Sequence, residues 1–394
     1  GPDAHGPPTW RGAASAAAAA AGVARIQELL RESDEETLAP PLGPGAPGPA
    51  SSATGAGTDA EALSSAEVAR RHWREWDPRA MQTPGVPDWP IGWKDKYVDA
   101  KLLAEGSFGC VYKCKVKGQN RYVAVKIVDI DTLGDLAAVQ EEIENLQLFG
   151  GGDVVSFFDA VSQTDFSHRT RIFMLMEAAD CDLHAVMERG VFHIPMDNRV
   201  NIAVQMVRGL QKFAKQGFVH RDVKPANVLV FGDPSSPEGC RVKLADLGIT
   251  SGEHIMRKNE AVVGSRWYIA PEVWSRRGSL RKSDVWSAGI VLYQLFLGHL
   301  PESFSQVSLS DAAYGLKGDP LADFLQSEFN ILDDKAFLEF KRKDPQVARV
   351  IASMLTKRVW LRASMRRALA RLRGIARDRG ITVPEPEYVE LLQT

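Results

Sequence analysis

The feature that most constrains the fold of this chain is a change in its hydrophobic pattern close to Asp182. Before this point, short runs of β-branched and aromatic residues such as YVAVKIVDI alternate with turn residues, and one helical pattern, LAAVQEEIENLQLF, lies among them. After it, longer patterns with apolar residues three or four apart dominate, as in NIAVQMVRGLQKFAKQG. The short runs are typical of an antiparallel sheet and the long ones of amphipathic helices. We therefore predict an α+β fold in which a sheet-rich lobe with one helix precedes a larger, mostly helical lobe, with a cleft between them.

Two segments with a different composition precede this pattern. Residues 1–66 are dominated by Ala, Gly, Pro and Ser. We expect them to be largely disordered, because they cannot bury enough apolar surface to offset the entropy of ordering. Within them, VARIQELLRESDEETL has helical spacing, which is typical of a transient helix in a tail or, alternatively, of a helix that docks on a partner. Residues 67–96 contain four tryptophans and are predicted to pack on the following domain, since tryptophan is seldom left in solvent.

Composition excludes several classes of protein. The formal net charge is −2, so no global field attracts nucleic acid or an anionic membrane, and no apolar run has the length of a membrane span. The four cysteines form no C-x-x-C pair, which favours free thiols in a reducing compartment over a zinc site or a disulfide framework. A cytoplasmic location is therefore predicted, with secretion or organelle targeting as the alternative if an upstream signal has been removed.

The most informative motif is FVHRDVKPANVLVF, in which polar residues lie between two apolar flanks that are typical of strands. In a loop, this order places a proton acceptor (Asp222), a cation (Lys224) and a metal-coordinating amide (Asn227) side by side. The motif resembles the catalytic loop of eukaryotic protein kinases, H-R-D-x-K-x-x-N, with a coincidental polar turn as the alternative. A lysine two residues after the aspartate is the mark of the Ser/Thr members of that family.

The resemblance extends to residues that hold the nucleotide in this family. LLAEGSFGCVYK resembles the glycine-rich turn over the phosphates, but Ala104 stands at the first glycine position, so we expect somewhat weaker nucleotide binding without its loss. In IFMLMEAADCDL, Met176 resembles the residue at the back of the pocket, followed by the adenine-reading backbone and a residue near the ribose. The implied nucleotide-binding residues are Leu103, Ala104, Glu105, Gly106, Ser107, Phe108, Gly109, Val111, Ala124, Lys126, Met176, Glu177, Ala179, Asp182 and Leu229.

A lysine in the strand motif VAVKIV, Lys126, resembles the family lysine that holds the α- and β-phosphates and pairs with a glutamate of the inserted helix. Two adjacent glutamates are available. Glu142 is preferred because its spacing in EIENL matches the family, whereas Glu141 would face about a hundred degrees away. The catalytic residues that the resemblance implies are Asp222, Lys224, Lys126 and Glu142.

The motif VKLADLGIT resembles the metal-binding Asp-Phe-Gly motif, with Leu247 in place of phenylalanine. The resemblance therefore implies that Asn227 and Asp246 bind Mg²⁺, whose preference for hard oxygen ligands suits amide, carboxylate and phosphate groups. Leu247 is expected to stack with Leu146 and His220 in an apolar column that links the lobes.

The segment between Asp246 and the tripeptide Ala-Pro-Glu resembles the activation segment of the family. Ser265 matches a hydroxyl residue that bonds Asp222 and Lys224, with a helix-capping serine as the alternative. Asp284 is expected to hold the backbone of the catalytic loop. The resemblance also implies that Glu272, the last residue of Ala-Pro-Glu, pairs with Arg362.

This segment contains no hydroxyl residue at the place where family members with an arginine before the catalytic aspartate are usually phosphorylated. Ala261 stands at that place, with Glu260 beside it, and the only hydroxyl residues before Ser265 lie close behind the metal-binding aspartate. We hypothesise that Glu260 partners Arg221 permanently, so that its carboxylate replaces a phosphate. The enzyme is then expected to be active without phosphorylation of the activation segment.

Taken together, the motifs imply a protein kinase domain over residues 97–372, with lobes at about 97–178 and 179–372 and a C-terminal tail at 373–394. The implied function is transfer of the γ-phosphoryl group of Mg-ATP to serine or threonine hydroxyls of a protein substrate. The alternative is a nucleotide-binding pseudokinase or scaffold whose N-terminal tail docks a partner.

Overall fold

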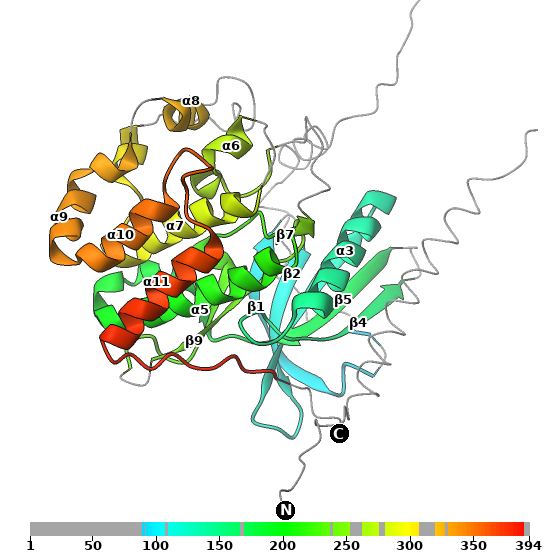
Figure 1. The fold of residues 1–394 in the computed structure, drawn as a ribbon. Helices are drawn as coiled ribbons and strands as arrows, with labels where there is room; N and C mark the ends of the chain where they lie inside the picture. Colours follow the sequence, from blue (N-terminus) through cyan, green and yellow to red (C-terminus); the bar gives the residue numbers. More distant parts are fainter. Residues whose placement is uncertain are drawn as a thin grey trace, which may run out of the picture.

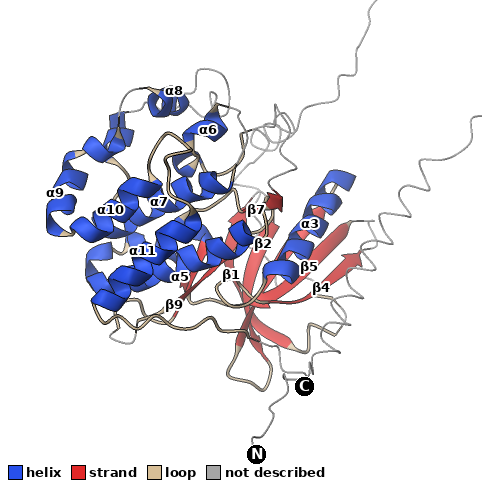
Figure 2. Cartoon of the chain, viewed as in Figure 1, coloured by secondary structure: helices blue, strands red, loops and turns tan. Residues whose placement is uncertain are grey.

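The structure is a computed structural model with two lobes, one built mainly from strands and one mainly from helices (Figure 1). The residues that it describes are 89–90, 92–106, 109–165, 169–236, 239–252, 262–275, 280–306, 320–327 and 330–389. Figure 2 shows the large sheet on one side of the molecule and most of the helices on the other. The predicted α+β, bilobal fold is therefore confirmed.

The N-lobe is a five-stranded antiparallel sheet in the order β1-β2-β3-β5-β4, accompanied by one long helix, α3. Its elements are β1 (Tyr97–Gly106), β2 (Gly109–Val116), β3 (Tyr122–Ile130), α3 (Leu133–Phe149), β4 (Phe157–Thr164) and β5 (Thr170–Glu177). The helix begins where Thr132 and Asp135 form a reciprocal capping box, which satisfies amide groups that have no partner inside the helix.

The segment just before β1 is part of the N-lobe core. Trp89 and Trp93 are buried, and both rings lie edge-on or tilted against Phe173 of β5, with centroids 6.3 and 6.4 Å apart. Trp89 also contacts Tyr112, and Trp93 contacts Tyr97. These two tryptophans therefore pack on the sheet, whereas residues 1–88, with the other two tryptophans of the predicted extension, lie outside the described residues.

The C-lobe is built around two helices, α5 and α7, and also contains two small antiparallel sheets, β10-β7 and β6-β8-β9. Its strands are β6 (Cys181–Asp182), β7 (Phe218–Val219), β8 (Val228–Phe231), β9 (Arg241–Leu244) and β10 (Ser251–Gly252). Its helices are α4 (Leu183–Glu188), α5 (Met196–Lys215), α6 (Pro271–Trp274), α7 (Arg281–Leu297), α8 (Pro320–Gln326), α9 (Lys335–Lys343), α10 (Pro345–Met354) and α11 (Met365–Asp378).

Helix α7 is the centre of the C-lobe. It is apolar on almost every side, as its sequence DVWSAGIVLYQLFL indicates, and fourteen of its seventeen residues are buried. A helix without a polar face is stable only inside a larger core. The polar side chains that α7 does carry are therefore held by specific partners, and two of them organise the site described below. No helix in the described part of the chain is long and apolar enough to cross a membrane.

The four cysteines are all free thiols, and their burial differs. Burial raises the pKa of Cys114 and of Cys240 to about 12, whereas Cys110 and Cys181 are only partly buried. Because the thiolate is the reactive form, we expect iodoacetamide at pH 8 to modify Cys110 and Cys181 slowly in the native protein and to leave the other two intact. Mass spectrometry of native and denatured samples checks this; equal modification of all four native thiols would contradict the packing.

Candidate active site

The catalytic-loop motif lies between β7 and β8, and Asp284 of α7 holds its backbone. The carboxylate of Asp284 accepts the amide of His220 at 2.7 Å and that of Arg221 at 3.0 Å. Burial raises the pKa of Asp284, although both amides favour its ionised form. Arg221 has a φ of 70°, a left-handed conformation that is uncommon for residues other than glycine. The Asp284 bonds therefore fix the loop in a shape that its own sequence does not favour.

One carboxylate, that of Asp222, joins the polar residues of this loop. Its Oδ2 lies 2.7 Å from Lys224 Nζ and accepts a hydrogen bond of 3.0 Å from Asn227 Nδ2. Its Oδ1 accepts the backbone amide and the hydroxyl of Ser265 at 2.9 and 2.8 Å. The resemblance implies that the Ser265 hydroxyl bonds both Asp222 and Lys224. Among the described contacts it bonds Asp222, and none joins it to Lys224. The structure thus brings three predicted residues, Lys224, Asn227 and Ser265, together around the Asp222 carboxylate.

On the N-lobe side, Lys126 of β3 meets Glu142 of α3. The ammonium lies 2.6 and 2.8 Å from the two Glu142 oxygens, and 3.7 Å from Oδ1 of Asp246. Burial alone would lower the pKa of Lys126, but the two carboxylates outweigh it and raise the pKa above its ordinary value. Glu141, by contrast, is exposed. Helical geometry therefore directs the expected one of two adjacent glutamates at the lysine.

The residues that follow Asp246, at the start of the activation segment, contact α3. Leu247, at the phenylalanine position of the family motif, is completely buried, as are Leu146 and His220, the other predicted members of the apolar column. Asn145 of α3 donates hydrogen bonds to the carbonyls of Leu247 (3.4 Å) and Thr250 (2.9 Å). Sequence analysis missed Asn145; the available signal was a polar residue three positions after Glu142, on the same face of the helix.

The two predicted metal ligands fit Mg²⁺. Asn227 uses its amide nitrogen to bind the Asp222 carbonyl and carboxylate, so its amide oxygen remains available to a cation. The Asp246 side chain is 40% exposed and supplies a carboxylate beside Lys126. Among the described residues there is no group of three or more His, Cys, Asp or Glu that could hold an ion unaided. Two oxygen donors suit Mg²⁺, which usually keeps water and phosphate oxygens as its other ligands.

Four of the predicted nucleotide-binding residues, Val111, Ala124, Lys126 and Met176, lie on one face of the N-lobe sheet. Strand register places Val111 opposite Lys126 and Ala124 opposite Met176, and directly opposed residues project from the same face. At the start of β2, Gly109 has a φ of 108°, and an added Cβ would lie 1.9 Å from the carbonyl oxygen of Ile127. Glycine is therefore required at that position.

The remaining predicted pocket residues have different positions. Leu103, Ala104 and Glu105 are exposed on β1, whereas Ser107 and Phe108 lie outside the described residues. Asp182 caps α4 by accepting the amide of Ala185 at 2.8 Å, so its role beside a ribose stays a prediction. The other members that the structure describes are the backbone of Gly106, which faces Gly109, together with Glu177, Ala179 and Leu229 around the junction of the lobes.

The junction between the lobes contains two lysines that sequence analysis missed. Lys243 of β9 is buried and lies 2.7 and 2.8 Å from the two carboxylate oxygens of Glu177. Lys113 of β2 donates a 2.8 Å hydrogen bond to the carbonyl of Ala179. We call residues 177–180 the hinge, since they connect β5 to the C-lobe. The signal for Lys243 was a lysine between apolar neighbours in VKLADLGIT, three residues before Asp246.

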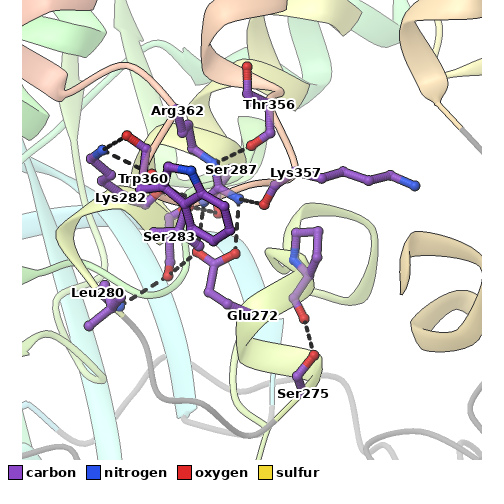
Figure 3. Close-up of polar contacts among 12 residues, drawn as sticks. Glu272, Ser275, Leu280, Lys282, Ser283, Ser287, Thr356, Lys357, Trp360 and Arg362 are labelled. Atoms are coloured by element: carbon purple, nitrogen blue, oxygen red, sulfur yellow. Dashed lines mark hydrogen bonds and ion pairs between the residues drawn. The ribbon is translucent and has the colours of Figure 1, made fainter. Parts of the chain in front are cut away.

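The activation segment is anchored at its end by a buried ion pair. Glu272 of α6 and Arg362 face each other through two bonds of 2.7 and 2.9 Å, as Figure 3 shows. Ser283 of α7 donates a third bond, of 2.8 Å, to Glu272. The Arg362 guanidinium also lies 5.2 Å from the ring centroid of Trp286. Glu260 lies outside the described residues, so its predicted contact with Arg221 stays a hypothesis.

Comparison with known proteins identifies the family. The sequence model of the family described as "Protein kinase domain" matches residues 97–372, more than half of the chain. Serine/threonine-protein kinase ppk11 of Schizosaccharomyces pombe is 31% identical over 53% of this chain and 64% of its own length. Serine/threonine-protein kinase pakH of Dictyostelium discoideum is 26% identical over 60% of this chain and 44% of its own length.

A plant protein, CBL-interacting protein kinase 4 of Oryza sativa subsp. japonica, is 30% identical over 54% of this chain and 47% of its own length. The chain therefore spans less than two thirds of the length of each of these relatives. The family match covers both lobes and every motif around Asp222, and on these grounds the chain belongs to the protein kinase family.

Proposed function

We propose that this protein is a protein serine/threonine kinase that transfers the γ-phosphoryl group of Mg-ATP to hydroxyl groups of a protein substrate. The observation that carries the proposal is the Asp222 carboxylate, which is contacted by Lys224, Asn227 and Ser265 in one cluster. The names of the relatives, which include Ser/Thr protein kinases, support the same activity.

In the proposed mechanism, Asp222 orients the acceptor hydroxyl and accepts its proton as the new oxygen–phosphorus bond forms, while the bond from the γ-phosphorus to the bridging oxygen breaks and ADP leaves. Lys224, 2.7 Å from Asp222, offsets the negative charge of the phosphoryl group during transfer. Lys126, fixed by Glu142, holds the α- and β-phosphates. Mg²⁺ held by Asn227 and Asp246 would neutralise the charge on the phosphates. Most of the acceleration comes from positioning and preorganised charge, because the protein forms no covalent bond with the substrate.

The test is incubation of the full chain with labelled ATP, Mg²⁺ and a panel of acceptor proteins and peptides, followed by identification of the labelled amino acid. We expect label on serine or threonine and not on tyrosine, with Asp222→Asn as the inactive control. The alternative, a nucleotide-binding scaffold, predicts ATP binding without transfer by either chain. Equal transfer by both chains would refute the proposed role of Asp222.

We further propose that activity does not require phosphorylation of the activation segment. In the unmodified chain, Ser265 already bonds Asp222 and Lys126 already bonds Glu142. The only hydroxyl residues between Asp246 and Ser265 in the sequence are Thr250 and Ser251. Both are buried, at 0% and 5% exposure, so another kinase could not reach them in this conformation.

The corresponding prediction is that phosphatase treatment leaves turnover unchanged and that Ser251→Ala keeps full activity. Ser251 suits this substitution because β10 pairs through its backbone with β7, and that pairing does not need the hydroxyl. Turnover is measured before and after treatment, with mass spectrometry to show that no phosphate remains. Loss of activity on dephosphorylation would refute the proposal.

Glu260→Arg tests the hypothesised charge, and we expect it to lower turnover while ATP binding is retained.

A further inference from the structure

The chain continues beyond α11 into a C-terminal segment, Ile381–Val389, that connects the two lobes. In Figure 1 this segment is the red trace that leaves α11 and runs past β9 towards the N-lobe sheet. At one end, Ile381 and Val383 pack against the main core cluster, and the Ile381 amide bonds Ala376 at 2.8 Å. At the other end, Val389 packs against the N-lobe cluster that contains Trp89.

Arginines of the C-lobe hold this segment by its backbone. Arg208 of α5 donates to the carbonyl of Pro384 at 2.8 Å, and Arg241 of β9 donates to that of Glu385 at 3.1 Å. Arg241 also lies 3.0 Å from the carboxylate of Glu387. Backbone contacts of this kind fix the path of a chain whatever its side chains are. The C-terminal segment is therefore built into the molecule at defined positions.

The carbonyl of Glu387 is the central contact. It accepts the amide of Gly152, in the loop between α3 and β4, and the ammonium of Lys243, each at 3.1 Å. The Lys243 ammonium has three donors, and its other two bonds go to the carboxylate of Glu177 in the hinge. One carbonyl of the C-terminal segment thus supplies the third acceptor of a buried ammonium whose other two hydrogen bonds go to the hinge carboxylate of Glu177.

Tyr388 fits the same loop closely. An added Cβ on Gly151 would lie 2.5 Å from Cδ1 of Tyr388, so the ring occupies the space that the absent side chain leaves. The ammonium of Lys212, from α5, lies 5.8 Å from the centroid of the Tyr388 ring. Next to it, Val389 lines a cavity of about 260 Å³ that is also lined by the hinge residues Glu177 and Ala178. The last described residue of the segment therefore lines the same cavity as the hinge.

We propose that the C-terminal segment positions the hinge for nucleotide binding. The carbonyl of Glu387 fixes Lys243, and Lys243 fixes Glu177, whose backbone is expected to read the adenine. Without the segment, one donor of a buried ammonium loses its acceptor, and only Lys243 and the amide of Ser156 (3.2 Å) still hold the Glu177 carboxylate. This proposal rests on the proposed function, because it assigns the hinge to nucleotide binding.

The test compares three chains: the full chain, one that ends at Val389, and one that ends at Pro384. The second deletes only residues 390–394, so it keeps every contact described above and is the matched control. The third loses the Glu387 carbonyl and Tyr388 but keeps the Ile381 and Val383 packing. Binding of a non-hydrolysable ATP analogue with Mg²⁺ is measured by calorimetry. We expect at least about fivefold weaker binding only in the chain that ends at Pro384.

Steady-state kinetics of the same chains distinguish positioning of the hinge from a role of the segment in stability alone. Positioning predicts a raised KM for ATP with unchanged kcat at saturating ATP and unchanged KM for the protein substrate. A purely structural role predicts a lower melting temperature with the same affinity for each folded molecule, which would overturn the proposal. The same affinity in all three chains, or equal loss in both shortened chains, would also overturn it.

A point variant keeps the test decisive if the shorter chain does not fold. In the full-length protein, Tyr388→Ala removes the ring from Gly151, and we expect ATP-analogue binding to weaken by at least about twofold. Glu385→Ala is the control, because its side chain makes none of the described contacts and only its carbonyl is used. Equal affinity of these two variants would refute the proposal. Because calorimetry needs no phosphoryl transfer, failure of the proposed kinase activity and failure of this inference give different results.

Discussion

Asp222→Asn is expected to lower phosphoryl transfer by about 10²- to 10⁴-fold, the usual contribution of a general acid–base group. The amide has nearly the same shape as the carboxylate, so its oxygen can keep the two bonds that Ser265 donates. Its nitrogen is a donor and would face the amide nitrogen of Asn227, so that bond cannot form. What is lost is the proton acceptor and the negative charge opposite Lys224, 2.7 Å away. ATP affinity is expected to stay the same, because Asp222 is not among the predicted nucleotide or metal ligands.

Single-turnover kinetics at saturating ATP measure this loss directly, and calorimetry with an ATP analogue measures affinity on the same sample. Asp233→Asn is the matched control: Asp233 is an exposed aspartate in the same lobe, and among the described residues its side chain bonds only Ser235. The control is expected to retain full transfer. Transfer by Asp222→Asn at the rate of the control would show that another group takes the proton.

Glu272→Ala is expected to lower the free energy of unfolding by about 3–5 kcal/mol, because it leaves the buried Arg362 guanidinium without its counter-charge. The side chains of this pair are 5% and 0% exposed, so water cannot replace the lost carboxylate without opening the core. Ser283 loses its acceptor in the same substitution. Figure 3 shows how closely α6 and the loop before α11 meet through this one pair.

Urea denaturation of Glu272→Ala and of an exposed-pair control measures the difference. Arg377 and Asp378 form the control pair, 3.6 Å apart with side chains 82% and 57% exposed. Arg377→Ala is expected to change stability by less than about 1 kcal/mol. A double variant with two apolar residues, Glu272→Leu and Arg362→Met, is expected to recover part of the loss, because no unpaired charge remains. Equal effects of Glu272→Ala and Arg377→Ala would contradict the burial of the pair.

The sequence predicted the parts of the site that depend on local spacing. Helical periodicity distinguishes Glu142 from its neighbour Glu141, and the structure places Glu142 against Lys126. Likewise, the catalytic-loop motif holds Asp222 and Asn227 five residues apart, a separation short enough for the loop itself to bring them together. Patterns of this kind are visible in a single sequence because the physical cause and the effect lie within a few residues of each other.

Contacts between distant segments could not be predicted in the same way. Lys243 and Glu177 lie in strands 66 residues apart, and Glu387 reaches Lys243 across 144 residues. A lysine in an apolar strand is compatible with an edge facing solvent, so its sequence does not reveal a buried partner. Asn145 is a similar case, since its acceptors are backbone carbonyls, which leave no trace in the sequence. The tertiary structure is needed to identify the contacts that Lys243, Glu387 and Asn145 make.

The packing of Trp89 and Trp93 has a consequence for how this chain can be divided into folding units. The family match begins at Tyr97, eight residues after Trp89, yet both rings fill space against Phe173 in the middle of the sheet. A chain cut at the edge of the family match would have an N-lobe with a hole in its hydrophobic interior and newly exposed aromatic surface. The cooperative folding unit is thus longer than the homologous domain. A chimera joined to a relative at Tyr97 would lack Trp89 and Trp93, although the N-lobe core packs against both rings.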